Sequence, residues 1–217
     1  MNKKENLSES ASIKVSGIKS DLSVDQGAML DAKNNFLQSQ LLIAMPAMGD
    51  PNFDHTVTLI CQHNNDGCFG LTINRPIQVT LEELFEQLDI PTDNDAIKGV
   101  RALCGGPVQP EQGFVIHDTE KKWENTLPIN DDLAVTASHD ILLDIAIGKG
   151  PENFLLTLGC ASWGSEQMLK EIKNNSWLNC DVDKKILFNT PFEKRWTHAV
   201  DTMGIDVSCI SEEAGHD

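Results

Sequence analysis

Short apolar runs rich in β-branched and aromatic residues occupy residues 41–44, 56–62 and 69–74. Runs of this length, bounded by turn-forming residues, predict β-strands. Asp66 and Gly67 lie between the second and third runs, where they suit a tight turn, so we expect a hairpin there. Residues 100–103 and 114–117 give a second pair of predicted strands, and residues 154–158 give another.

Three other segments carry apolar residues at helical spacing. The first follows Thr80, and Glu83 three residues later predicts a capping box. The second follows Ser138, which we expect to cap it. The third is expected to start with Thr190 as its cap and Pro191 at its first position. Strands and helices mix without a regular βαβ repeat, which favours an α+β fold.

The apolar pattern also sets the expected domain boundaries. Residues 1–33 have no sustained apolar face, so we expect a flexible N-terminal extension. Residues 34–210 are expected to form one α+β domain, and residues 211–217 a flexible C-terminal tail. The sequence shows neither a secretory signal nor an apolar run of roughly 20 residues, so we expect a cytoplasmic protein that does not enter the membrane.

The net charge of −16, from 33 acidic and 17 basic residues, changes the range of expected partners. Binding to DNA depends on lysine and arginine side chains that neutralise phosphates. An acidic surface repels phosphates, so we expect no direct contact with nucleic acid. The six cysteines are expected to be reduced, because nothing places the chain outside a reducing compartment.

Candidate polar residues cluster around the first predicted hairpin. Asp54 and His55 are an acid/base pair by residue type, but neighbours at the start of a strand are expected to point to opposite faces. Asn74 and Arg75 end a predicted strand, and the guanidinium can pair with a carboxylate or phosphate of a ligand. The alternative partner for Arg75 is the carboxylate of Asp50 or Asp54.

A second candidate segment is Gly105, Gly106 and Pro107, where the chain is expected to leave a strand. Two adjacent glycines allow a close backbone approach that side chains would block. The segment either lines a groove beside Arg75 or forms an ordinary turn. We expect it to meet the segments around Arg75 and Gly159 at one edge of the sheet, where any functional site would lie.

The segment from Gly159 to Ser165 is predicted to be a loop between a strand and a helix. Its spacing is similar to a phosphate-binding P-loop, but Ser165 stands where that motif requires lysine, which excludes nucleotide hydrolysis by that route. With Ser165 as the cap after Gly164, the helix N-terminus can still receive an anion through its amides. Trp163 is instead expected to cover the end of the sheet.

Cys61, His63 and Cys68 are three soft metal ligands near one hairpin. They lack a fourth ligand and the paired spacing of a zinc finger. The alternative is that Cys61 faces the core while His63 begins an exposed turn, and we expect neither metal nor cofactor.

Three segments carry a family resemblance: AMPAMGDPNFDHTVTLICQHNNDGCFGLTINRP, CGGPVQPEQGFVIHD, and FLLTLGCASWGSEQMLKEIKNNSWL followed by ILFNTPFEKRWTHAVDTMGID. Together they resemble the YqgE/AlgH family, over residues 35–206. The resemblance implies a single α+β domain whose sheet bends into a partial barrel. It also implies a bacterial cytoplasmic protein described as a transcriptional regulator, with no chemistry attached to that description.

Two functional hypotheses follow. The first is a non-catalytic protein that influences transcription through a protein or small-ligand partner. The alternative is an enzyme or small-ligand sensor with an anion-binding cleft near Arg75 and residues 159–165. No catalytic residue is assigned in either case.

Overall fold

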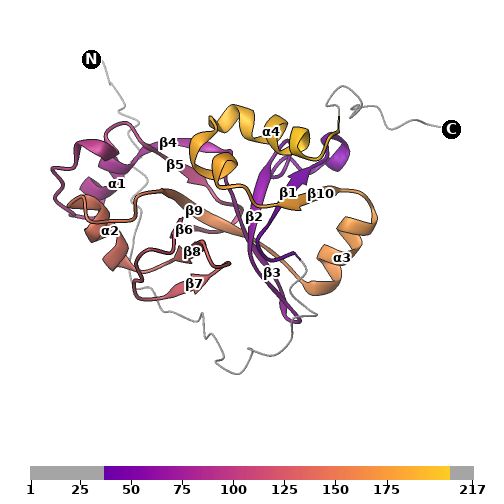
Figure 1. Ribbon diagram of the computed structural model, residues 1–217, viewed down its shortest axis with the longest axis horizontal. Helices are drawn as coiled ribbons and strands as arrows, with labels where there is room; N and C mark the ends of the chain where they lie inside the picture. Colours follow the sequence, from indigo (N-terminus) through magenta and orange to yellow (C-terminus); the bar gives the residue numbers. More distant parts are fainter. Residues whose placement is uncertain (1–36, 206–217) are drawn as a thin grey trace, which may run out of the picture.

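A curled sheet of ten strands organises the computed structural model, which describes residues 37–205 (Figure 1). The strands are β1 (Gln40–Ala44), β2 (Val57–Asn64), β3 (Gly67–Thr72), β4 (Pro76–Thr80), β5 (Arg101–Cys104), β6 (Val108–Asp118), β7 (Thr126–Pro128), β8 (Leu133–Thr136), β9 (Phe154–Trp163) and β10 (Trp177–Asp181). The predicted hairpin between β2 and β3 is confirmed. The expected boundaries at residues 33/34 and 210/211 lie outside the described residues.

The sheet runs in the order β10-β1-β2-β3-β9-β6-β8-β7, and these neighbours are antiparallel. Strand β9 is central. One of its edges pairs with β6, while the other pairs first with β5, in parallel, and then with β3. Strand β4 adds to β5. The result is the bent, partly barrel-like mixed sheet of an α+β domain, as predicted.

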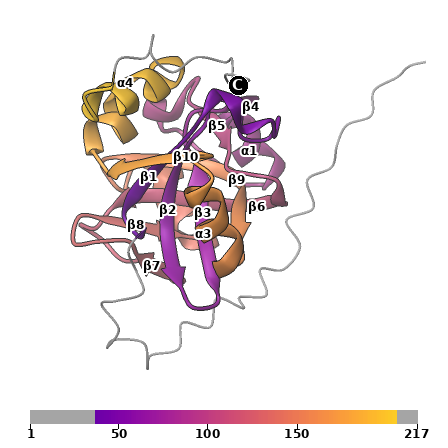
Figure 2. The same cartoon turned by 90° about the vertical axis from the view of Figure 1, so that its right-hand side faces the viewer.

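Helices pack around this sheet at three places (Figures 1 and 2). They are α1 (Leu81–Gln87), α2 (His139–Ala146), α3 (Ser165–Lys173) and α4 (Arg195–Thr202), with the 3₁₀ turns η1 (Pro46–Met48), η2 (Asp95–Ile97) and η4 (Phe192–Lys194) and the π-helical turn η3 (Lys185–Asn189). None of the helices in residues 37–205 has the length and apolar content to cross a membrane.

Three apolar clusters lie between the helices and the sheet. The largest joins α4 to the strands and includes Leu59 and Ile116. The second lies beneath α1 and α2 and includes Phe85 and Ile141. The third, which includes Met168 of α3, lies beside β3 and β9. Burial of these side chains at about 25 cal/mol per Å² of apolar surface is the main force that holds the helices on the sheet.

The predicted capping box of α1 is confirmed. The backbone amide of Glu83 donates to Thr80 Oγ1 at 3.3 Å, and the amide of Thr80 donates to Glu83 Oε2 at 2.9 Å. Ser138 occupies the N-cap position of α2, but its hydroxyl makes no capping bond and donates to the carbonyl of Glu124 instead.

The predicted start of the last helix is wrong. Pro191 precedes the 3₁₀ turn η4, and α4 begins only at Arg195. Thr190 Oγ1 donates to the carbonyl of Lys185 at 3.0 Å rather than capping a helix. Arg195 explains the later start, because its buried guanidinium donates to the carbonyls of Thr190 and Ile73 and so fixes the turn against the sheet.

Candidate functional site

Four of the predicted site residues lie together where β3 ends. Asn74 Nδ2 donates to the carbonyl of His55 at 2.8 Å. The guanidinium of Arg75 donates to the carbonyl of Asp54 at 2.7 Å and to that of Pro51 at 3.3 Å. Arg75 therefore bonds to backbone carbonyls, and the alternative ion pair with the carboxylate of Asp50 or Asp54 does not form among residues 37–205. Its contact with a ligand stays a prediction.

The expectation that Asp54 and His55 point to opposite faces is wrong. His55 has a left-handed backbone, with φ of 51°, which turns its ring back so that Nδ1 lies 2.6 Å from Asp54 Oδ1. The ring also lies 5.0 Å from that of Trp196, centroid to centroid. The two polar side chains are 44% and 59% exposed. Water therefore reaches the pair, which weakens its electrostatic effect on any reaction.

The backbones of the three segments meet at Arg75, residues 104–106 and residues 158–160, but they do so at the central strand β9 and not at one edge of the sheet as expected. The amide of Cys104 donates to the carbonyl of Arg75, and the amide of Gly105 donates to the carbonyl of Leu158, both at 2.8 Å. A Cβ atom on Gly106 would lie 2.3 Å from the carbonyl carbon and oxygen of Cys160. The glycines thus serve close packing against β9, while Pro107 is exposed.

The predicted loop between Gly159 and Ser165 is wrong, because β9 continues through Trp163. Gly159 lies beside Gly106, and it is separated from Gly164 by about 16 Å of extended strand. Helix α3 begins at Ser165, with Gly164 rather than Ser165 as its N-cap.

Trp163 is 3% exposed, and its ring lies 5.5 Å from that of Phe53 and 5.8 Å from that of Trp177. The packing role expected for Trp163 is confirmed. The candidate residues are therefore divided between the middle of β9, at Gly159, and its C-terminal end, at Trp163.

A groove lies elsewhere, between α1 and α2 and above β6 and β9. It is open to solvent, and its cavity volume is about 50 Å³. The apolar lining comes from both helices and both strands: Leu84, Leu88, Val115, Ala137, Leu142, Leu156 and Leu158. The polar lining is Glu111, Gln112, Thr136, Ser138 and His139. None of the predicted site residues lines this groove.

Local sequence explains the walls and the mouth of the groove. Leu84 and Leu88 are four residues apart and so share one side of α1, while Phe85 faces the core. Strand β6 pairs with β9 at Val108 and again at Gly113, with a bulge between them. The bulge places Glu111 and Gln112 at the groove.

Two further apolar side chains at α2 are exposed outside the lining of the groove. Leu143 is 44% exposed and Ile147, just after the helix, is 59% exposed. They are the two most exposed large apolar side chains of residues 37–205. Together with His139 they are spaced four residues apart, so they form one exposed stripe next to Leu142.

An acidic segment lies beside the C-terminal end of α2. Residues 81–98 contain six acidic residues and one lysine. The side chains of Thr92 and Asn94 donate to the carbonyls of Ala146 and Ile145, at 2.8 and 2.7 Å, which holds this acidic segment beside the end of α2.

Comparison with known proteins identifies the family. Residues 41–208 match the AlgH-like family. The chain belongs to that family. An UPF0301 protein from Alcanivorax borkumensis is 42% identical over 187 residues, which cover 86% of this chain and 100% of the relative. A second, from Legionella pneumophila strain Lens, is 47% identical over 180 residues, which cover 83% and 96%.

Two solved structures share the fold of this AlgH-like chain. The solution structure of AlgH from Pseudomonas aeruginosa is 39% identical, with a TM-score of 0.70, and covers 86% of this chain and 98% of its own. A crystal structure from Corynebacterium diphtheriae has a TM-score of 0.64 and covers 83% and 99%; at 17% identity it shows the fold alone.

The cysteines of this AlgH-like chain are structural within the described residues. Cys61, Cys68 and Cys160 are buried and free. Burial raises the pKa of Cys68 to about 12 and that of Cys160 to about 11, so both thiols stay protonated at neutral pH. His63 lies inside β2 and is 3% exposed, so the exposed turn expected there is wrong. No group of three or more metal-ligating side chains is placed to hold a metal ion in residues 37–205.

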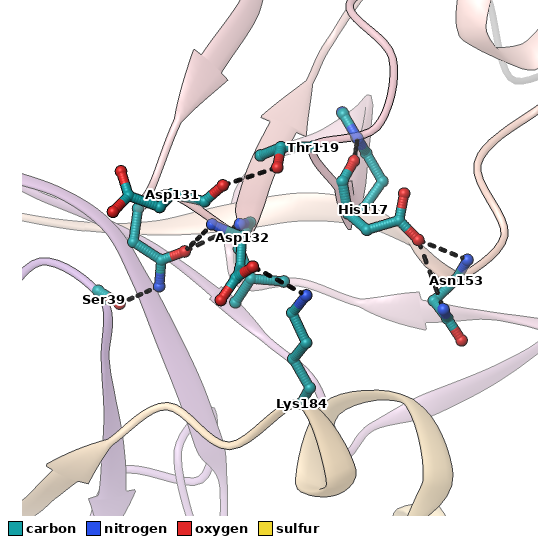
Figure 3. Close-up of polar contacts among 10 residues, drawn as sticks. Ser39, His117, Thr119, Asp131, Asp132, Asn153 and Lys184 are labelled. Atoms are coloured by element: carbon teal, nitrogen blue, oxygen red, sulfur yellow. Dashed lines mark hydrogen bonds and ion pairs between the residues drawn. The ribbon is translucent and has the colours of Figure 1, made fainter.

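A polar network lies at the end of β6, where Figure 3 shows His117 and Asn153, and a bond from His117 to Thr136 joins β6 to β8. His117 Nδ1 donates to the carbonyl of Asp118 at 2.6 Å, and its Nε2 lies 2.8 Å from Thr136 Oγ1. Burial lowers the pKa of His117 below its usual 6.5. Asp118 Oδ2 accepts from Asn153, while Oδ1 is buried without a hydrogen-bond partner among the described residues. One open acceptor oxygen is too little to hold a cation.

Sequence reasoning missed the residues of the groove. Leu84 and Leu142 both belong to the apolar stripes that predict helices, so the sequence pattern assigns them to the core. The available signal was Leu143 and Ile147, two large apolar residues outside the inward stripe of α2.

Proposed function

We propose that this protein regulates transcription in the cytoplasm through a protein partner that binds the groove between α1 and α2, rather than by contact with DNA. The observation that carries the proposal is the apolar groove, together with the exposed side chains of Leu143 and Ile147 at α2. Contiguous exposed apolar surface is costly to keep in water, and proteins retain it mainly where something binds.

The charge of the molecule supports a protein partner over nucleic acid. The net charge of −16 repels a phosphate backbone, whose binding requires neutralising lysine and arginine residues. The exposed stripe on α2 also supports a protein partner over a small molecule, because the apolar surface extends beyond the pocket itself.

The anion-binding cleft at Arg75 is not proposed in its place. The guanidinium already donates to the carbonyls of Asp54 and Pro51. In addition, Gly106 packs directly on the backbone of β9.

The test uses the full chain in the cell that makes it. A photo-crosslinking amino acid is placed at Ile147 and, as the control, at Leu169 of α3, which is also exposed. The expected result is a crosslink to one protein from position 147 but not from position 169. Transcript profiles of Ile147→Asp should match those of a deletion strain, while Leu169→Asp should match the wild type.

Two results would contradict the proposal. One is a deletion that changes transcripts while Ile147→Asp leaves them at wild-type levels. The other is a crosslink from position 147 to DNA.

A further inference from the structure

We propose that Thr92 and Asn94 are the residues that position the two walls of the groove for the partner protein. The inference rests on the proposed function and identifies the side chains that control that site. Three features of the described residues carry it: where these two side chains lie along the chain, which groups they bond to, and how they are held themselves.

The segment that follows α1 crosses from one wall of the groove to the other. Leu84 and Leu88 of α1 line one side, and Leu142 of α2 lines the other. Thr92 and Asn94 lie four and six residues beyond Leu88, and both side chains reach the C-terminal end of α2. In the described part of the chain, theirs are the only hydrogen bonds that join α2 to α1 or to the segment after it.

Both bonds end on carbonyl groups of the kind that a helix leaves open at its C-terminus. Thr92 Oγ1 donates to the carbonyl of Ala146 at 2.8 Å, and Asn94 Nδ2 donates to that of Ile145 at 2.7 Å. The exposed Ile147 directly follows Ala146 in the chain. The two bonds therefore fix the last turn of α2 and the start of the chain beyond it relative to the other wall.

The two donors are held by the backbone around them. Thr92 Oγ1 accepts from the amide of Asn94 at 3.2 Å, and Asn94 Oδ1 accepts from the amide of Ala96 at 3.0 Å. Both side chains are half-buried. Because each donor has a fixed orientation, a shift of the segment after α1 would break its bond to α2 rather than be absorbed by the side chain.

Apolar packing alone defines the distance between the walls less sharply. Both helices contribute to one apolar cluster, which includes Phe85 and Ile141 and holds the helices on the sheet. Apolar burial is non-directional, whereas a hydrogen bond weakens steeply as its angle changes. The other end of α2 is tied away from α1, because the amide of Glu124 donates to Asp140 Oδ2 at 2.9 Å. The two bonds at the C-terminal end are thus the directional contacts between the walls.

Two substitutions of similar shape remove the donors. Thr92→Val loses the hydroxyl, and Asn94→Asp places a carboxylate oxygen, in place of the donor, against the carbonyl of Ile145. Thr92→Ser retains the hydroxyl and is the conservative control. Thr80→Ala is the control for stability, because it weakens the start of α1 without touching either bond.

Methyl NMR of the purified full chain tests the positioning without a partner. In Thr92→Val combined with Asn94→Asp, the methyl resonances of Leu88 and Leu142 should shift, while those of Leu59, in the cluster under α4, should not. Thr92→Ser should leave all three in place. Unmoved resonances of Leu88 and Leu142 in the double variant would overturn the inference.

Crosslinking in the cell tests the consequence for binding. The photo-crosslinking amino acid is placed at His139, which is exposed and lines the groove. The yield of the partner crosslink should fall about tenfold or more in the double variant, because a displaced wall no longer fits the partner. It should stay within about twofold of the wild type in Thr92→Ser and in Thr80→Ala. An equal loss in Thr80→Ala would assign the effect to stability and so contradict the positioning role.

The inference and the proposed function fail separately. If the partner crosslinks equally to the wild type and to the double variant, the proposed function stands and this inference fails. If the resonances of Leu88 and Leu142 shift as expected but no protein crosslinks to the wild-type groove, the proposed function fails, while Thr92 and Asn94 still position the walls.

Discussion

Replacing Gly106 with alanine tests whether the double glycine serves packing or lines a site. The new Cβ would lie 2.3 Å from the carbonyl carbon and oxygen of Cys160 and 2.5 Å from the amide nitrogen of Ala161, all backbone atoms of the central strand β9. Overpacking of this kind costs about 1–3 kcal/mol. The φ of 151° adds strain of about 1–3 kcal/mol for a residue with a Cβ. We expect Gly106→Ala to lower the free energy of unfolding by about 2–5 kcal/mol, a large part of the typical 5–15 kcal/mol.

Urea unfolding of three variants separates the cost of overpacking from the cost of backbone strain. A Cβ on Gly113 would enter open space, and this glycine has no left-handed φ, so Gly113→Ala should stay within about 0.5 kcal/mol of the wild type. Gly49 has a φ of 73° in open space, so Gly49→Ala isolates strain at about 1 kcal/mol. If Gly106→Ala matched Gly113→Ala, the backbones would not be closely packed, and the segment would be free to line a groove.

Three further changes have defined outcomes. Thr80→Ala removes the capping box of α1 and should lower the free energy of unfolding by about 1 kcal/mol in thermal or urea unfolding, whereas the exposed Glu86→Ala should leave it nearly unchanged. The pKa of His117 is lowered in the folded state, so the unfolded state binds a proton at this residue more readily. The contribution of His117 to the free energy of unfolding should therefore be constant above about pH 7 and should fall as the pH drops below 6.5. Urea unfolding at several pH values would contradict this if His117→Gln had the same pH slope as the wild type. Arg195→Met leaves the carbonyls that Arg195 bonds without a donor and should cost about 2–4 kcal/mol, while the exposed Arg101→Met should cost less than about 0.5 kcal/mol by the same assay.

Local signals predicted those elements whose ends are fixed by nearby residues. The capping box of Thr80 and Glu83 and the β2–β3 hairpin need only residues a few positions apart, and both formed as expected. The last helix failed because Arg195 is buried and bonds to the carbonyl of Ile73, which is 122 residues away in the chain. A cap signal at Thr190 carries no information about that contact.

The loop predicted at Gly159 of β9 was also wrong because of contacts with residues that are distant in the chain. Gly159 usually signals a loop, but here the strand continues because the carbonyls of Gly106 and Val108 occupy the place of its side chain. Such a requirement comes from a neighbouring strand, and a single sequence does not display it. The groove was missed on the same grounds, because its walls, Leu84 and Leu142, become neighbours only after folding.

The exposed Glu111 lies at the mouth of the apolar groove, and its charge limits what the groove can bind. An apolar surface alone would attract a second copy of the chain as readily as any other partner. Two copies that met through this surface would bring together their Glu111 carboxylates and two chains that each carry a net charge of −16, and these like charges oppose the contact. The same carboxylates attract a segment of opposite charge and favour its encounter. On the proposed function, the charge would therefore oppose self-association through the groove, which an apolar surface alone would not do.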